Sequence, residues 1–234
     1  MWISIIFIPS GTIINLKLIF NQMNNLTNTE KVSNKPSKPR GRPLAFSQDQ
    51  ALEKALQVFW ARGYEGTSMA ELVEALGINK PSIYATFGNK EVLFNKALEK
   101  YMTGPASFVG EAMNEPTAKQ VAEKFLTGAV TFFTDKSHPL GCMIVQGALT
   151  CGQGSALIQQ TLMAHRWKLE ERFKQRFDLA KKLGDLPAHT QSADLAKYLT
   201  TLHQGMSVQS TSGASKQELL AVVQLALQNW PNGQ

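Results

Sequence analysis

Hydrophobic residues recur at helical spacing from Ser47 to the end of the chain, and no stretch shows the strict alternation that is typical of a β-strand. Ser47 can cap the first predicted helix, with Gln50 as the second member of a capping box, and Gly63 lies where that helix should end. The apolar stripe of this helix, which we assign to the core, consists of Leu52, Ala55, Leu56, Phe59 and Trp60.

A second, shorter helix is predicted soon after the first. Ser68 and Glu71 have the spacing of a capping box, in which each side chain satisfies a free backbone amide of the first turn. Gly77 can adopt the left-handed conformation that ends a helix. The apolar stripe between these signals consists of Met69, Leu72, Val73 and Leu76.

A third helix is expected to follow after a very short turn. Asn79 is a favourable N-cap, and Pro81 is acceptable in the first turn because the amides there lack intrahelical partners. Ile83 and Phe87 are four residues apart, so both should face inward. Gly88 lies where this helix should end.

The remaining chain is also predicted to be helical. Asn89 can cap a fourth helix that runs from about residue 90 to beyond 101. Later helices are expected at 117–134, 141–149, 155–182, 189–210 and 215–229, with a loop at 136–139. We therefore predict an all-α protein with a compact three-helix unit followed by a larger helical bundle.

The charge of the chain is concentrated before the first predicted helix. The 234 residues carry a formal net charge of +6, and the segment 24–46 alone contributes +4. Its single acid is Glu30, and three prolines interrupt it. Such a segment cannot bury apolar surface, so we interpret it as a flexible basic arm. Its basic residues are Lys31, Lys35, Lys38, Arg40 and Arg42.

The first 22 residues have a different character. The apolar runs 3–8 and 13–20 are separated by Pro9, Ser10 and Gly11, and neither run has the roughly 20 residues of a membrane helix. We also find no convincing secretory signal. Our hypothesis is that Met23 is the true start and that 1–22 is not native. The alternative is a disordered or weakly membrane-associating tail.

Cysteine usage favours a reducing compartment. Cys142 and Cys151 are too few for a disulfide framework or a cysteine-rich zinc site, and we expect a cytoplasmic protein. Cys142 could be a sensor thiol, since His138 precedes it by four residues, but a free cysteine is more often a small buried hydrophobic residue. We favour that second interpretation.

The turn between the second and third predicted helices indicates a DNA-binding function. Two short helices joined by a tight glycine-containing turn are typical of a helix-turn-helix, whose second helix enters the major groove. Lys80, Pro81, Ser82 and Tyr84 should lie on the outer face of that helix. Lysine can donate to guanine O6 and N7, a serine hydroxyl can donate or accept, and a phenol suits a phosphate oxygen.

The segments 55–68 and 76–91 resemble the DNA-binding domain of the TetR family. This resemblance implies base contacts from Lys80, Pro81 and Ser82 and phosphate contacts from Thr67, Tyr84 and Lys90. Ala85 and Thr86 depart from the family pattern, in which larger polar or aromatic residues are frequent. The residues expected at the DNA interface of this domain are therefore Thr67, Ser68, Lys80, Pro81, Ser82, Tyr84, Thr86 and Lys90.

The basic arm carries a second DNA-binding signal. The sequence from Pro39 to Pro43 is similar to the core of an AT-hook, in which two arginines flank a glycine. A narrow minor groove has an enhanced negative potential that attracts arginine. We expect Arg40 and Arg42 to bind there; the alternative is a solvated linker.

The resemblance also implies a domain organisation. It assigns 1–46 to a disordered segment with the basic arm, 47–92 to the helix-turn-helix domain and 93–234 to a ligand-binding and dimerisation domain. An unidentified small-molecule effector would bind within 105–185, and a homodimer would bind a palindromic operator on double-stranded DNA. Repression is the default, although an activator would have the same features. From composition alone, candidates for the effector pocket are Phe125, Phe132, Cys142, Met143, Met163 and Trp167.

The resemblance also implies a dimer interface in which the last two helices of each protomer form a four-helix arrangement. The apolar residues available to this interface or to the protomer's own core are Leu195, Tyr198, Leu199, Leu202, Leu219, Leu220, Val223, Leu227 and Trp230.

Other function classes lack support in the sequence. We find no metal-ligand spacing, no Ser/His/Asp arrangement and no phosphate-binding glycine loop, so we expect neither an enzyme nor a cofactor. His165 and His203 are isolated and are as easily structural as functional. Two rival interpretations remain, a non-specific architectural DNA binder that uses the arm and a helical interaction module without DNA.

Overall fold

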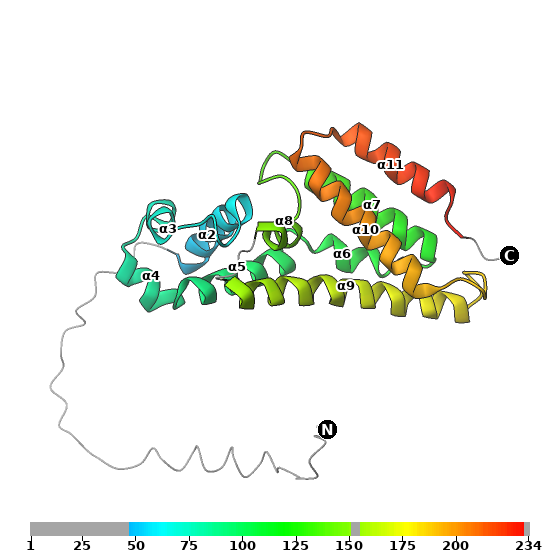
Figure 1. Ribbon diagram of the computed structural model, residues 1–234, viewed down its shortest axis with the longest axis horizontal. Helices are drawn as coiled ribbons and strands as arrows, with labels where there is room; N and C mark the ends of the chain where they lie inside the picture. Colours follow the sequence, from blue (N-terminus) through cyan, green and yellow to red (C-terminus); the bar gives the residue numbers. More distant parts are fainter. Residues whose placement is uncertain (1–46, 151–154, 232–234) are drawn as a thin grey trace, which may run out of the picture. The chain divides into compact units, whose positions relative to one another are not determined.

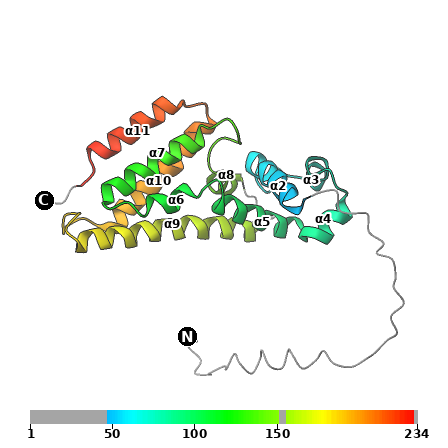
Figure 2. The same ribbon diagram turned by 180° about the vertical axis from the view of Figure 1, so that it is seen from behind.

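The computed structural model describes residues 47–150 and 155–231, and all regular structure in these ranges is helical (Figures 1 and 2). The all-α prediction is confirmed. None of the helices in these ranges is both long and apolar enough to cross a bilayer. The predicted arm and the first 22 residues lie outside the described residues.

The first four helices begin at the caps that the sequence indicates. They are α2 (Gln48–Arg62), α3 (Met69–Leu76), α4 (Lys80–Phe87) and α5 (Lys90–Thr103). The Ser68–Glu71 capping box is complete. Of the capping box predicted at Ser47, the structure shows the first half, in which the hydroxyl accepts from the Gln50 amide.

The later helices are α6 (Phe108–Ala112), α7 (Ala118–Phe133), α8 (Met143–Thr150), α9 (Ala156–Lys182), α10 (Ser192–Thr211) and α11 (Lys216–Gln228). All but one match a predicted helix to within three residues at each end. The exception is α6, a single short helix that the sequence analysis did not find. Helices α7 and α11 each begin with a complete capping box, at Thr117 and Ser215.

The three-helix unit is built around α2, which packs against α3 on one side and α5 on the other (Figure 1). Phe59 and Phe94 meet edge-on with ring centroids 5.1 Å apart, and Leu56 and Leu72 are completely buried beside them. Burying such aromatic and aliphatic side chains stabilises each by about 1.5–3 kcal/mol relative to exposure. The predicted domain boundary at 92/93 falls within α5, so this boundary stays a prediction.

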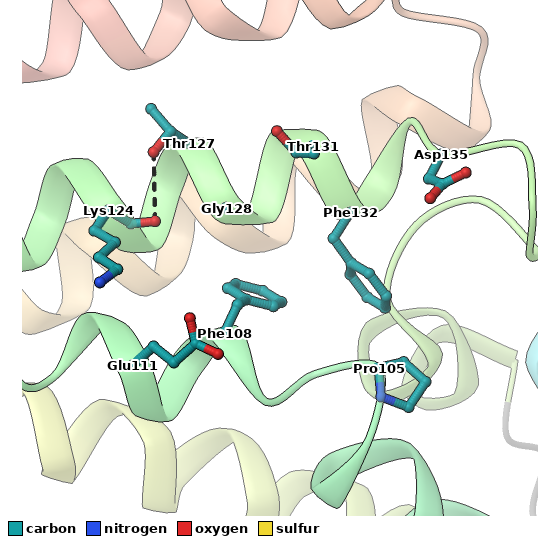
Figure 3. Close-up of a pocket in the computed structure, with 9 residues that line it drawn as sticks. All are labelled: Pro105, Phe108, Glu111, Lys124, Thr127, Gly128, Thr131, Phe132 and Asp135. Atoms are coloured by element: carbon teal, nitrogen blue, oxygen red, sulfur yellow. Dashed lines mark hydrogen bonds between the residues drawn. The ribbon is translucent and has the colours of Figure 1, made fainter.

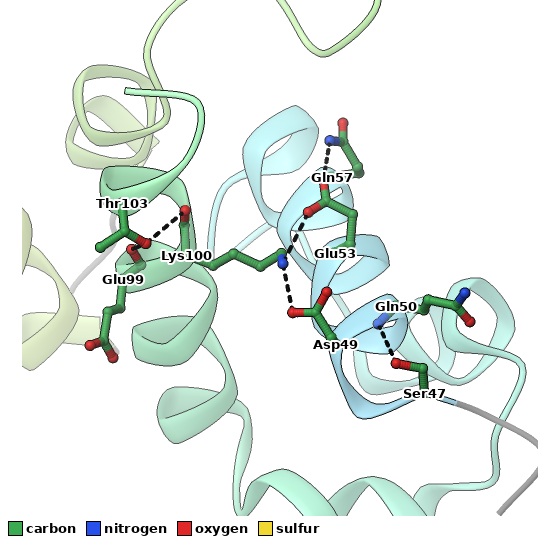
Figure 4. A network of polar contacts seen from close by, with 8 residues as sticks. All are labelled: Ser47, Asp49, Gln50, Glu53, Gln57, Glu99, Lys100 and Thr103. Carbon is green, nitrogen blue, oxygen red and sulfur yellow. Dashed lines mark hydrogen bonds and ion pairs between the residues drawn. The ribbon is translucent and has the colours of Figure 1, made fainter. Parts of the chain in front are cut away.

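A polar contact also joins α2 to α5 (Figure 4). The Lys100 ammonium lies 2.8 Å from an Asp49 carboxylate oxygen and 3.6 Å from Glu53. The hydrogen bond that Lys100 donates to Asp49 raises the pKa of Lys100. Because Asp49 and Glu53 are largely exposed, the ion pairs orient α5 on α2 more than they stabilise it.

The larger bundle is centred on α10. This helix packs along α9 and α7, and α11 covers another part of α7 (Figures 1 and 2). His203 of α10 is buried and stacks on Phe125, with ring centroids 5.0 Å apart and an interplanar angle of 23°. The His203 ring also packs against Phe133, with ring centroids 5.1 Å apart. The isolated histidine is therefore a core residue among aromatic rings.

Candidate nucleic-acid interface

The turn that precedes α4 fixes where this helix begins. Gly77 has φ 71° and ψ 24°, in the left-handed region, and its amide donates to the Val73 carbonyl at 3.0 Å. Asn79 then caps α4, because its side-chain oxygen accepts from the Ser82 amide at 2.9 Å. Both predicted signals are confirmed. They place Lys80 at the first position of the helix.

One face of α4 anchors the helix, and the other is open to solvent. Ile83 and Phe87 are buried. Lys80, Pro81 and Tyr84 are exposed, and Tyr84 retains 44% of its surface. Within the described residues, the outer face of α4 is therefore accessible in the way that a groove-binding helix requires.

The remaining predicted residues of α4 are partly covered. Ser82 and Thr86 are half-buried, so each presents only part of its side chain. The Lys80 ammonium lies 5.9 Å from the centroid of the Tyr84 ring, near the outer limit for a cation–π contact. Lys80 and Tyr84 thus share one end of the exposed face, and a bound duplex would meet both side chains together.

The side chain of Thr67 is used within the fold. It is completely buried, and its hydroxyl donates to the Gly63 carbonyl at 2.7 Å. The hydroxyl faces inward because it satisfies the last turn of α2. The phosphate contact expected at Thr67 rests on the backbone amides at the start of α3 and stays a prediction, and the neighbouring Ser68 is exposed there.

Ser68 and Glu71 form a compact polar group at this helix start. The Ser68 amide donates to Glu71 at 2.7 Å, and the Glu71 amide donates to the Ser68 hydroxyl at 3.2 Å. The bond from the Ser68 backbone is the main cause of the lowered pKa of Glu71, and an ion pair with Arg62 adds to it. The Ser68 hydroxyl also bonds the Glu71 carboxylate and contributes to this lowered pKa, so a phosphate would compete with Glu71 for the hydroxyl proton.

Lys90, at the start of α5, is held by an aromatic ring. Its ammonium lies 4.2 Å from the centroid of Tyr64, within cation–π range. Partial burial lowers the pKa of Lys90, and the nearby carboxylates Glu65 and Glu71 oppose that shift. Lys90 is half-buried. The ring therefore restricts the side chain beside the helix-turn-helix, while the charge stays partly open to solvent.

Arg40 and Arg42, the proposed minor-groove residues, lie outside the described residues. The AT-hook interpretation accordingly stays a prediction.

The residues suggested for the effector pocket lie in several different environments. Phe125, Cys142 and Met143 are core residues, and Met163 is half-buried. Trp167 is 64% exposed on α9, so it cannot line an enclosed pocket in this protomer. Only Phe132 of the six lines the groove between α6 and α7.

Cys142 is surrounded by protein. The Tyr101 hydroxyl lies 3.4 Å from its sulfur, and its amide donates to the Ser207 hydroxyl at 2.8 Å. Burial raises the pKa of the Cys142 thiol. A raised pKa and a buried position are the opposite of what a reactive thiol requires, which supports the interpretation of Cys142 as a small core residue.

Trp60 has a role beyond the core position that the sequence assigned to it. Its indole N–H donates to the Gly141 carbonyl at 3.2 Å, and its ring stacks on His138 with centroids 4.4 Å apart. Trp60 therefore connects α2, the first helix of the three-helix unit, to the loop between α7 and α8. Helical periodicity could identify Trp60 as buried, but no local signal indicates a partner 81 residues away.

Comparison with known proteins agrees with this geometry. Residues 51–97 match the model of the bacterial regulatory proteins of the tetR family. The chain is 36% identical over 197 residues to the HTH-type transcriptional repressor ComR of Escherichia coli K12, covering 83% of this chain and 93% of ComR. The chain belongs to the TetR family. It is a DNA-binding transcriptional regulator with an N-terminal helix-turn-helix domain and a larger helical domain.

Two further TetR-family proteins support this conclusion. The HTH-type transcriptional repressor BdcR of Escherichia coli K12 is 27% identical over 199 residues, which cover 83% of this chain and 94% of BdcR. The solved structure of a CifR cysteine mutant, complexed with 26-bp double-strand operator DNA, is 39% identical with a TM-score of 0.78. That match covers 81% of this chain and 100% of the CifR chain.

In the part of the chain that the structure describes, no group of three or more His, Cys, Asp or Glu side chains is placed to hold a metal ion.

Proposed function

We propose that this protein is a ligand-responsive repressor that binds a palindromic operator as a homodimer and places α4 in the major groove. The observation that carries the proposal is the two-sided character of α4. Ile83 and Phe87 are fixed in the core, while Lys80, Pro81 and Tyr84 are exposed at the start of the same helix. A helix whose inner face is anchored in the core can present its exposed side chains to DNA without rearrangement.

Each exposed residue has a distinct role in this proposal. Lys80 donates to base acceptors, Pro81 and Ser82 add contacts at the same end of the helix, and Tyr84 donates to a phosphate oxygen. Lys90 and the hydroxyl of Ser68 bind neighbouring phosphates. Thr86 contributes less, because it is half-buried and has a short side chain. Arg40 and Arg42 of the arm enter the adjacent minor groove.

The dimer is proposed to form through α10 and α11. No Asp, Glu, Lys or Arg occurs in 198–215 or in 219–230, although both segments reach the surface. Tyr198, Val222 and Leu225 are 43%, 41% and 62% exposed. An uncharged surface with exposed apolar residues suits a self-complementary interface.

The apolar residues expected at that interface divide into two sets. Leu195, Leu199, Leu219, Val223 and Trp230 are buried within the protomer, so they belong to its own core. Tyr198 is exposed, and Leu202, Leu220 and Leu227 are half-buried, so these four are available to a partner.

The effector relieves repression if it stabilises a conformer whose two copies of α4 no longer fit one side of a duplex. In this proposal the protein acts in the cytoplasm, where its DNA is, and it has no catalytic role. Its relatives ComR and BdcR are named repressors, which supports this sign of regulation.

Selection of bound fragments from genomic DNA tests the proposal directly. We expect an enriched inverted repeat whose half-sites lie near a whole number of helical turns apart, each turn about 34–36 Å. One operator should bind an even number of protomers. Fragments without shared sequence would instead support an architectural binder that uses the basic arm, and removal of residues 24–43 would then abolish binding.

A further inference from the structure

A groove with a cavity volume of about 500 Å³ lies between α6 and α7 (Figure 3). This volume is within the range of about 300–1,000 Å³ that small-molecule sites occupy. Its apolar lining is formed by Pro105, Phe108 and Phe132, and its charged lining by Glu111, Lys124 and Asp135.

Two aromatic rings form the apolar part of the groove. Phe108 and Phe132 lie with ring centroids 5.5 Å apart. Gly128 of α7 allows this arrangement, because a Cβ atom there would lie 2.9 Å from Cδ2 of Phe108. Figure 3 shows both rings between the charged side chains that line the groove. An aromatic or aliphatic ligand body would therefore find flat apolar surfaces here.

The charges that line the groove are unbalanced. The Lys124 ammonium is bound by Glu115 at 2.6 Å, so it is already compensated. Among the described residues, Glu111 and Asp135 form no direct ion pair within 4.0 Å, although Lys124 attracts Glu111, and His138 and Lys216 attract Asp135, over longer distances. The Ser137 amide lowers the pKa of Asp135, which keeps this carboxylate ionised at neutral pH. The groove thus combines two carboxylates that lack a direct ion pair with aromatic faces, and both attract organic cations.

The groove also contacts the DNA-binding unit, because its Phe132 ring packs against α2. Phe132 lies 5.3 Å from Trp60 of α2 and 4.7 Å from His138, measured between ring centroids. Trp60 in turn is fixed by its hydrogen bond to Gly141. A ligand that displaces the Phe132 ring would therefore alter the packing beneath α2, the first helix of the DNA-binding unit.

We propose that this groove is an effector site for a small organic cation with an aromatic or otherwise apolar body. The cation binds between Glu111 and Asp135, its body contacts Phe108 and Phe132, and the shift of Phe132 against Trp60 changes the DNA affinity. This inference rests on the proposed function, because it assigns the effector site of that regulator.

Calorimetry with two ions tests the groove itself. Tetraphenylphosphonium and tetraphenylborate have similar size and apolar surface but opposite charge. We expect saturable binding of the phosphonium and at least about tenfold weaker binding of the borate, a difference of about 1.4 kcal/mol. The double variant Glu111→Gln with Asp135→Asn should lower phosphonium affinity by about tenfold as well.

The matched control is Glu123→Gln, an exposed carboxylate of α7 that does not line the groove. This variant should bind the phosphonium as the parent protein does. Absence of saturable phosphonium binding, equal binding of both ions, or equal losses in the control and the double variant would overturn the assignment.

The coupling to DNA has its own measurement. Tetraphenylphosphonium should lower affinity for the selected operator in the parent protein and in Glu123→Gln. The effect should be reduced in Phe132→Leu and in the double variant. An equal effect in all four proteins would overturn the coupling. If the ion-free protein selects no DNA sequence, the proposed function fails, whereas the calorimetry still decides whether the groove binds cations.

Discussion

Single residues in this protein show how burial decides between alternative roles. Tyr84 and Trp60 are both aromatic residues on helices of the DNA-binding unit, but Tyr84 is 44% exposed and Trp60 only 2%. Exposure makes Tyr84 available to a phosphate, whereas the buried indole of Trp60 requires, and finds, an internal acceptor. Thr67 illustrates the converse, since its hydroxyl is used by the fold and is not available to DNA.

The residue-scale prediction concerns His203. Burial lowers its pKa from 6.5 to about 4. The unfolded chain therefore binds a proton at this residue as the pH falls below about 6.5, while the folded protein does so only near pH 4. Because the unfolded state binds more protons in this interval, stability falls as the pH falls through it. We expect His203 to account for a loss of about 2 kcal/mol between about pH 7 and 5.

Urea unfolding at both pH values and at fixed protein concentration measures this loss. The control is His203→Phe, which keeps an aromatic ring beside Phe125 but cannot titrate. The free energy of unfolding of this variant should depend less on pH by the stated amount. Identical pH dependence in the two proteins would show that His203 is not held neutral.

At the scale of elements, short-range signals predicted most of the helices. Capping residues such as Ser68 and Asn79 act within three residues, so the sequence shows both partners of each interaction. The helix α6 was missed because it is short, contains Gly110 and has no side-chain cap. The groove between α6 and α7 was missed for the same reason.

Contacts between distant elements could not be predicted from one sequence. The partner of Trp60 is 81 residues away, and periodicity indicates only that Trp60 is buried. Similarly, the sequence does not show which leucines of α10 and α11 belong to the core and which reach the surface. Only the packing against α7 and α9 shows which of them face inward.

Two glycines allow a prediction at this scale. Gly77 and Gly141 have φ values of 71° and 76°, but their surroundings differ. A Cβ on Gly77 would meet nothing within 4 Å, whereas one on Gly141 would lie 2.9 Å from Thr211 and 3.0 Å from the Ser207 carbonyl of α10. Gly77→Ala should cost about 1–2 kcal/mol from backbone strain alone. Gly141→Ala should cost about 1–3 kcal/mol more through overpacking.

Chemical unfolding of the two variants under one condition gives the comparison. Equal losses of unfolding free energy would mean that the loop before α8 does not pack tightly against α10.

At the scale of the whole molecule, the proposed recognition of an operator depends on two copies of the protein acting together. A palindromic operator requires a symmetric dimer, and the uncharged surfaces of α10 and α11 are the proposed contact. Leu225 is 62% exposed in the protomer, so its replacement should leave the protomer fold intact.

Leu225→Glu should therefore shift the protein from dimer to monomer in sedimentation experiments, because two carboxylates would be brought together at an apolar interface. Leu183→Glu is the matched control, since Leu183 is 71% exposed at the end of α9 and lies outside the proposed interface. Dissociation of both variants, or of neither, would place the dimer contact elsewhere.

The most direct test of the central claim is the ratio of affinities for the selected operator and for unrelated DNA. We expect Lys80→Ala to lower this ratio by a factor that corresponds to about 1–3 kcal/mol, because a base contact is lost. Tyr84→Phe should weaken binding to both DNAs about equally and leave the ratio unchanged, as expected for a phosphate contact. An unchanged ratio in Lys80→Ala would contradict the claim that the exposed face of α4 recognises the operator.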